Sequence, residues 1–306
     1  MAEERAAPLK ARVQGAVFRS LLGLLRALPY ETRVAFGGKI AAYVVAPLAG
    51  FRRRIRKNLR EICPELGADE VQRLTRAVPD NFGRTLTELF SPEDFVARLG
   101  DVQIEGPGLA AMEAAKAEGR PSILVSGHFG NYDAVRSTVI ARGFSVGGLY
   151  RPLNNRVIND IYVATISQIG TPLFERGRRG MAQMVKFLRD GGTLAILIDQ
   201  HMGNGARLTY FGKTAMTGLS AAELALKYNA VVVPCYGIRQ PDGVSFRVVL
   251  EAPVPHTTPE EMTQALNDSL EAQVRAHMGQ WLWIHREIPS EKTTTGSKRH
   301  LASLRR

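Results

Sequence analysis

The sequence has 306 residues, 45% hydrophobic and 23% charged, with a formal net charge of +11 at pH 7. This is the composition of an ordinary globular protein, and the length allows a large core in one domain or in a domain with a helical appendage. The two cysteines, Cys63 and Cys235, lie far apart without other metal ligands nearby, which argues against a disulfide framework or structural zinc and favours a reducing compartment.

The excess of basic residues predicts a polyanionic partner: nucleic acid, anionic lipid or an acidic carrier protein. Six of the nine residues from Arg52 to Arg60 are basic, and they follow the apolar stretch Ile40 to Phe51 directly. Basic residues beside an apolar segment are typical of a cytoplasmic membrane-surface anchor, although a solvated helix face has the same pattern. No zinc-finger spacing or aromatic RNA-binding segment is present, so nucleic acid is not expected as a partner.

The first elements along the chain are predicted to be two apolar helices. Apolar residues recur at helical spacing from Lys10 to Leu28 with arginines between them, which indicates an amphipathic helix. A second candidate, Val34 to Phe51, is interrupted by Lys39 and by Gly-rich breaks, and it is shorter than the roughly twenty apolar residues that a membrane span needs. Residues 1–60 are therefore expected to form a membrane-associating hairpin, in preference to a transmembrane helix or a soluble helical cap.

The remainder is predicted to form a domain over residues 61–287, followed by a disordered polar tail over 288–306. Helices are expected at 68–78 and 80–90, separated at Pro79. Strands are then expected at 122–126, 144–150, 171–174, 193–198, 230–237 and 244–250. Helices are expected between them at 131–142, 155–168, 178–190 and 218–228, with a last one from Pro259 to about Met278. Such alternation predicts an α/β fold with a mixed, mostly parallel sheet flanked by helices.

The chemistry is predicted to lie at a strand-to-helix crossing. The apolar run from Ser122 ends at Gly127, His128 follows at once, and Asp133 lies near the start of the next helix. His128 could take a proton from a hydroxyl as general base, and Asp133 could hold the other ring nitrogen. This arrangement suits acyl transfer to a hydroxyl, whereas a structural loop pair is the simpler alternative.

Polar clusters also follow other predicted strands, and ligands of open α/β sheets bind beyond the carboxyl ends of strands. These clusters, which we expect to converge on His128, are Arg151, Glu175 to Arg179, and Asp199 with Gln200. Arg151 could hold a phosphate or a developing oxyanion, and the basic turn after Glu175 could receive a phosphate at a helix N-terminus.

Gly127-His-Phe-Gly-Asn-Tyr-Asp133 resembles the central motif of the bacterial lipid A biosynthesis (lauroyl/myristoyl) acyltransferases, within the lysophospholipid acyltransferase superfamily. Further blocks in the same order are similar to that family: Arg56 to Leu59 with Pro64-Glu65, Asn81 to Arg84 with Glu88, Leu149 to Asn155, Ile198 to Gln200, Phe211-Gly212 and Trp281 to Arg286. Two departures are visible. Asp133 stands where the lipid A enzymes usually carry glutamate, and aspartate at this position is usual in the glycerophospholipid branch. After Arg286 the chain continues as Glu287-Ile-Pro, where the family tends to stay basic and aromatic.

The resemblance implies an O-acyltransferase of the His-x4-Asp type that moves a fatty acyl group from an acyl carrier protein or coenzyme A thioester to a lipid hydroxyl. It implies His128 and Asp133 as catalytic residues, the thioester as co-substrate, and neither metal nor cofactor. The substrate-binding residues that it implies are Asn131, Arg151, Asn154, Glu175, Arg176, Arg178, Asp199 and Gln200. The expected location is the cytoplasmic face of a bacterial inner membrane, with peripheral, monotopic or single N-terminal attachment.

The acceptor is expected to be a lipid A precursor, with a lysophospholipid or a lyso-aminolipid as the alternative. A basic membrane- or nucleic-acid-binding protein with a purely structural His/Asp pair is the alternative from another class.

Overall fold

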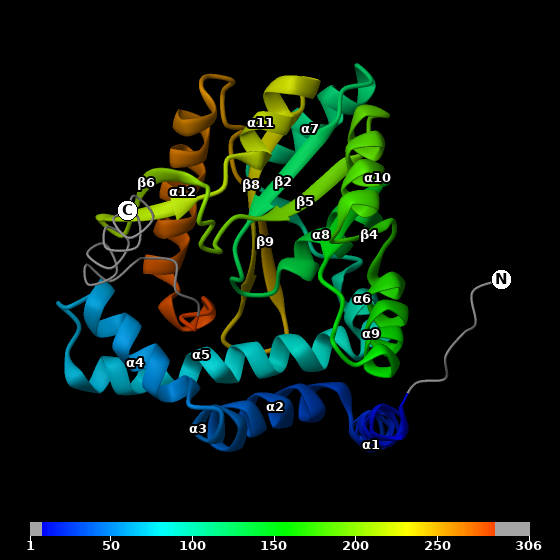
Figure 1. The fold of residues 1–306 in the computed structure, drawn as a ribbon, viewed down its shortest axis with the longest axis vertical. Coiled ribbons are helices and arrows are strands. Elements are labelled where there is room, and N and C mark those ends of the chain that lie inside the picture. The colour runs from blue at the N-terminus through cyan, green and yellow to red at the C-terminus, as the bar shows by residue number, and fades with distance from the viewer. Residues whose placement is uncertain (1–7, 285–306) are drawn as a thin grey trace, which may run out of the picture.

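The computed structural model describes residues 8–284 and is built around a seven-stranded sheet with the order β1-β9-β8-β2-β5-β3-β4 (Figure 1). Neighbouring strands are parallel except for β8 and β9. The strands are β1 (Ile104–Glu105), β2 (Ser122–Ser126), β3 (Val146–Tyr150), β4 (Leu173–Glu175), β5 (Thr193–Leu197), β8 (Val231–Arg239) and β9 (Phe246–Leu250). The predicted α/β fold with a mixed, mostly parallel sheet is confirmed. The predicted tail, residues 288–306, lies outside the described residues.

Helices cover both faces of the sheet because its central strands are apolar on both sides. Along β2, Ile123 and Val125 belong to a core shared with α10, α11 and α12, whereas Leu124 packs with α7 and α8. These helices and their neighbours are α6 (Pro92–Leu99), α7 (Gly108–Ala117), α8 (Tyr132–Ala141), α9 (Arg156–Ile169), α10 (Arg178–Arg189), α11 (Ser220–Tyr228) and α12 (Pro259–Ala276). The alternation predicted from the sequence is therefore confirmed from β2 to α12.

The helix α5 (Ala68–Leu89) runs through Pro79 without a break, so the prediction of two helices separated at this proline is wrong. Proline removes one hydrogen bond and costs about 3 kcal/mol inside a helix. Here α5 packs against α2 on one side and against the loop after β2 on the other, and Val78 and Pro79 are both buried. Tertiary packing over the whole helix therefore outweighs a local preference.

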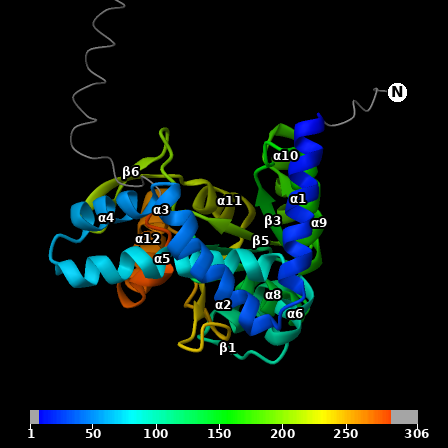
Figure 2. The same ribbon diagram turned by 90° about the horizontal axis from the view of Figure 1, so that it is seen from below.

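The N-terminal helices lie along α5 and the edge of the domain, where α1 packs against α9 and α2 against α5 (Figure 2). They comprise α1 (Leu9–Arg26), α2 (Tyr30–Ile40), a π-helical turn (Ala41–Val45), α3 (Ala46–Leu48) and α4 (Phe51–Ile62). Within residues 8–284, no single helix has the length and apolar composition of a membrane span. Tyr30–Leu48 and Phe51–Ile62, bent by 88°, meet those criteria only as a pair.

A hairpin of β6 (Ala206–Tyr210) and β7 (Lys213–Thr217) leaves the sheet and was not expected from the sequence. Its turn is Phe211-Gly212, and both residues have positive φ. The Phe211 ring stacks on Trp281, with 6.0 Å between ring centroids. The hairpin therefore packs over the indole of Trp281.

Candidate active site

The loop after β2 carries His128 and is held by backbone hydrogen bonds from two distant segments. The Asn131 N–H donates to Gly237 O (2.9 Å), and the Gly130 N–H donates to Gln280 O (2.9 Å). The Leu282 N–H donates to His128 O (3.1 Å). Gly130 has a φ of 53°, and a Cβ there would lie 2.0 Å from the Gly237 carbonyl oxygen, so only glycine fits. The histidine is thus presented on a fixed backbone.

The imidazole of His128 is paired with Asp199, which follows β5, the neighbour of β2 in the sheet. The His128 Nδ1 lies 2.8 Å from Asp199 Oδ1, and the His128 backbone N–H donates to Asp199 Oδ2 at 2.6 Å. The indole N–H of Trp281 also donates to Oδ2, at 2.9 Å. The carboxylate is almost fully buried while the imidazole side chain is 22% exposed. Asp199 is therefore fixed by three donors behind a ring that solvent or substrate can reach.

These contacts set the charge states of the pair. Burial alone would raise the pKa of Asp199, but the nearby imidazole, the hydrogen bonds from His128 and that from Trp281 lower the pKa below its ordinary value. Burial alone would lower the pKa of His128, but the charge and hydrogen bond of Asp199 raise the pKa above its ordinary value. Because an ionised carboxylate can only accept, Nδ1 carries the proton and Nε2 is the basic nitrogen.

Asp133, the predicted partner of His128, faces a different group. Its carboxylate Oδ1 lies 3.6 Å from Arg136 Nη1, one turn further along α8. Burial raises the pKa of Asp133, and the guanidinium of Arg136 opposes this. The expected contact of Asp133 with the His128 ring is thus corrected: Asp199 occupies Nδ1, because the ring points toward the adjacent strand end and Asp133 toward its own helix. A role for Asp133 in turnover stays a prediction.

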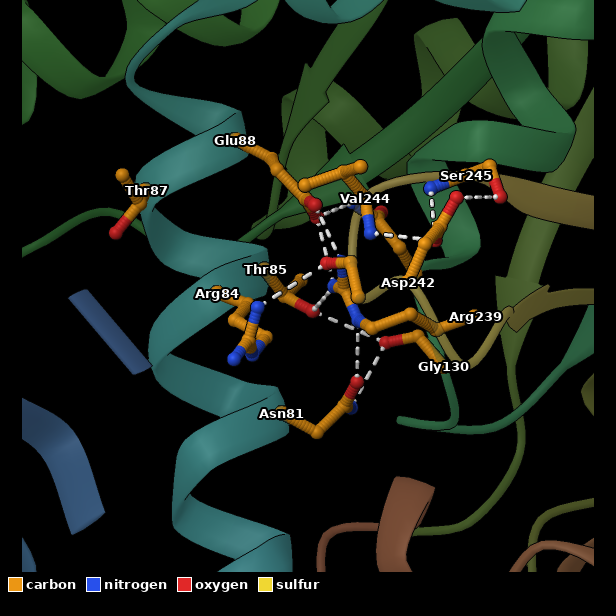
Figure 3. Close-up of polar contacts among 12 residues, drawn as sticks. Asn81, Arg84, Thr85, Thr87, Glu88, Gly130, Arg239, Asp242, Val244 and Ser245 are labelled. Carbon is orange, nitrogen blue, oxygen red and sulfur yellow. Dashed lines mark hydrogen bonds and ion pairs between the residues drawn. The ribbon is translucent and has the colours of Figure 1, made fainter. Parts of the chain in front are cut away.

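A buried ion pair ties this loop to α5 and β8. Glu88, fully buried, pairs with both Nη atoms of Arg239, one at 2.7 Å. The Asn131 side chain donates to Glu88 Oε2 at 2.8 Å while its Oδ1 caps α8. Asn81 and Thr85 both donate to the Gly130 carbonyl. Figure 3 shows these α5 side chains pointing toward Arg239 and Gly130. These contacts hold Asn131 in the loop, and its role in substrate binding stays a prediction.

The other predicted substrate residues lie along the same edge of the sheet but further away. Arg151 follows β3 and Glu175 ends β4, which places them two and three strands from β2. At about 4.8 Å per strand, their backbones are roughly 10 and 14 Å along the edge from that of His128. Asn154, Arg176, Arg178 and Gln200 are exposed, as are Arg151 and Glu175. The structure brings only Asp199 into contact with His128, and the substrate roles of the exposed residues stay predictions.

Two pockets lie beside the pair and share the side chains of Phe82 and Leu86. The small pocket, about 30 Å³, is also lined by His128, Tyr132 and Trp281. The larger is an apolar groove of about 320 Å³ between α1, α2 and α5. Among residues 8–284, no cluster of three His, Cys, Asp or Glu side chains is placed to bind a metal ion. His128 thus lines a small pocket that shares two lining residues with a larger apolar groove.

Arg239 and the polar contact of Trp281 were not predicted from the sequence. Arg239 was detectable as a lone charge ending an otherwise apolar strand, because such a charge requires a buried partner. The indole of Trp281 carried no such signal, since alternating tryptophans are usually packing residues.

Residues 15–288 match the family model of bacterial lipid A biosynthesis acyltransferases. A lipid A biosynthesis acyltransferase of Haemophilus influenzae is 23% identical over 277 residues, which cover 88% of this chain and 85% of that protein. A phosphatidylinositol mannoside acyltransferase of Mycolicibacterium smegmatis is 24% identical over 285 residues, which cover 90% and 91%. A Mycobacterium tuberculosis protein of the same name is 23% identical over 266 residues, which cover 84% and 83%.

Proposed function

Because the chain belongs to the bacterial lipid A biosynthesis acyltransferase family and is an acyltransferase of lipid biosynthesis, we propose that it moves a fatty acyl group from a thioester to a lipid hydroxyl. The donor is an acyl carrier protein or coenzyme A thioester. The observation that carries the proposal is the His128 ring, with Nδ1 on buried Asp199 and with its side chain lining the pocket that adjoins the apolar groove. This is the arrangement of a general base whose tautomer is fixed.

In the proposed reaction Nε2 of His128 takes the proton of the acceptor hydroxyl as its oxygen attacks the thioester carbonyl. Asp199 stabilises the imidazolium that forms. The tetrahedral intermediate collapses, the carbon–sulfur bond breaks, and His128 returns the proton to the departing thiolate. Arg151, beyond the end of β3, is proposed to contact the donor phosphate or the oxyanion.

The apolar groove between α1, α2 and α5 is proposed to hold the acyl chain. It shares Phe82 and Leu86 with the His128 pocket and is lined further out by Phe18, Leu22 and Phe51. An acyl chain laid there would have its carboxyl end near the imidazole. The groove would then set the preferred chain length.

Leu22→Trp should shift the preference toward shorter acyl donors by filling part of this groove. A donor two methylenes longer than the new optimum should lose roughly tenfold in kcat/KM, since each buried methylene is worth about 0.8 kcal/mol. Leu21→Trp is the matched control, because Leu21 is exposed on the same helix. The measurement is kcat/KM over a series of acyl-coenzyme A donors. Identical length profiles for the two variants would place the acyl chain elsewhere.

The acceptor is proposed to be a lipid A precursor, as for the Haemophilus relative. The Mycolicibacterium relative, which matches over a similar share of the chain, supports a phosphatidylinositol mannoside as the second candidate, beside the lysophospholipid or lyso-aminolipid considered from the sequence. An acceptor panel distinguishes them. Purified protein with an acyl thioester should acylate one class at least tenfold faster than the others, with His128→Ala as the blank. Thioester hydrolysis without transfer to any lipid hydroxyl would refute the proposed function.

We also propose that residues 1–60 attach the protein to the cytoplasmic face of the inner membrane and that residues 61–287 form the acyltransferase domain. The support is the outer face of α1, where Leu9, Val13, Val17, Leu21 and Leu24 are exposed. An exposed apolar stripe between basic residues is the pattern of a helix that lies in a membrane interface.

A further inference from the structure

A second pocket, lined by four arginines, lies between α4 and α5. Arg52, Arg56 and Arg60 come from α4, and Arg76, Gln72 and Thr75 come from α5. The three α4 arginines are spaced four residues apart and so share one face of that helix. The pocket holds about 340 Å³, a volume within the usual range of small-molecule sites. It is therefore a concave site with concentrated positive charge.

The charge in this pocket is not balanced within the described part of the chain. Over residues 8–284, no carboxylate lies within 4.0 Å of any of these four guanidinium groups. Two acidic residues of these helices form ion pairs elsewhere, Glu61 with Lys57 and Glu70 with Arg73. Arg52 donates from Nη2 to Ala42 O, but its buried Nε has no hydrogen-bond partner. Buried donors are normally satisfied, so this guanidinium has hydrogen-bonding capacity that the described residues leave unused.

The apolar residues beside the pocket indicate that the anion bound by the arginines belongs to a lipid. The Arg52 guanidinium lies 5.7 Å from the centre of the Tyr43 ring, and Tyr43 begins an apolar surface that continues to Leu48. Tyr43 is 62% exposed and Leu48 is 84% exposed. A positively charged pocket bordering an exposed apolar surface matches the depth at which lipid phosphates lie above acyl chains.

The pocket is separate from the reaction centre. Gln72 lines the arginine pocket and Phe82 lines the His128 pocket, both on α5. Ten residues of helix correspond to about 15 Å. The nearest lining residues, Arg76 and Val78, are two positions apart on α5, but the two pockets share no lining residue.

We propose that the pocket formed by Arg52, Arg56, Arg60 and Arg76 binds the phosphate of an anionic phospholipid headgroup, as a site distinct from the acyl acceptor site. Guanidinium groups bind phosphate in a bidentate manner that ammonium groups do not reproduce. The site would orient the protein on the membrane. It does not depend on the proposed acceptor, because binding is measured without an acyl donor.

The test compares two triple variants of the full chain that remove equal charge. One changes Arg56, Arg60 and Arg76 to Gln, and the other changes Arg53, Arg54 and Lys57, which are exposed and do not line the pocket. Binding is measured by sedimentation with phosphatidylcholine vesicles that contain phosphatidylglycerol. The affinity of the pocket variant for these vesicles should fall tenfold or more, and that of the other variant much less. The Lys version of the pocket triple should not restore binding.

A soluble short-chain phosphatidylglycerol provides the second measurement. It should raise the melting temperature of the wild type and of the control triple but not of the pocket triple, and inorganic phosphate should not reproduce the rise. Should the triple fold poorly, Arg76→Gln is compared with Arg73→Gln one turn away. Equal losses in both triples, full rescue by lysine, or an equal rise with inorganic phosphate would each overturn the proposal. Loss of acyl carrier protein binding with vesicle binding kept would also overturn it.

Discussion

Asp199→Asn should reduce acyl transfer by 10² to 10⁴, close to the effect of His128→Ala, in a protein that still folds. An amide can donate to Nδ1 of His128, which would place the proton on Nε2 and remove the basic nitrogen from the reactive position. The measurement is kcat with saturating acyl thioester and lipid, alongside thermal melting. Asp133→Asn is the matched comparison. Because Asp133 contacts Arg136, this variant should lose much less activity.

The pH dependence gives the same prediction a second readout. Asp199 raises the pKa of His128 above its ordinary value. Since the neutral ring is the base, wild-type kcat/KM should fall as pH decreases through that raised pKa, and activity should be complete above it. Without the carboxylate, burial lowers the pKa, so the acid limb of Asp199→Asn should move to lower pH. If the acid side of the pH profile does not move in Asp199→Asn, or moves only in Asp133→Asn, then Asp133 and not Asp199 is the functional partner of His128.

Glu88→Gln should destabilise the fold strongly. The change leaves the guanidinium of Arg239 buried without its counter-charge, and breaking a buried pair from one side costs about 3 to 5 kcal/mol. A loss of that size corresponds to roughly 10 °C in melting temperature for a chain of this size. Activity should fall beyond the loss of folded protein, because Glu88 also holds the side chain of Asn131.

The control for Glu88 is Glu105→Gln, which removes the same charge from a solvent-exposed pair with Arg247. Exposed pairs contribute about 0 to 1 kcal/mol, so its melting temperature should stay close to that of the wild type. Comparable melting of the two variants would show that the buried pair contributes no more than a surface one.

Six of the seven strands of the sheet were predictable because each is specified locally, whereas the two-residue edge strand β1 was not predicted. Buried runs with an apolar centre, such as Ser122 to Ser126, are followed by glycine or a polar residue, and the helices α8 and α9 have side-chain caps, at Asn131 and Asn155. The path of α5 was not predictable from Pro79 itself. The helix continues because α2 crosses it at Gly37 and Gly83, a contact between distant segments.

The partner of His128 could not be identified from sequence for a related reason. Asp133 is close in the chain and fits a known spacing, whereas Asp199 reaches the ring only because β5 pairs with β2. The residues of a single strand do not determine which strand it pairs with. The contact of Arg239 with Glu88 likewise joins positions 151 residues apart. Local pattern thus located the histidine and the general edge of the sheet, and topology decided its partners.

The backbone bonds from Gln280 and Leu282 to the His128 loop have a consequence for biosynthesis. A ribosome adding about 5 to 20 residues per second needs roughly 8 to 30 s to go from His128 to Leu282. Until that segment is added, the His128 loop lacks the backbone bonds to Gln280 and Leu282, and Asp199, once made, lacks the Trp281 indole. If the proposed mechanism holds, a polypeptide stalled before residue 280 should therefore lack acyltransferase activity.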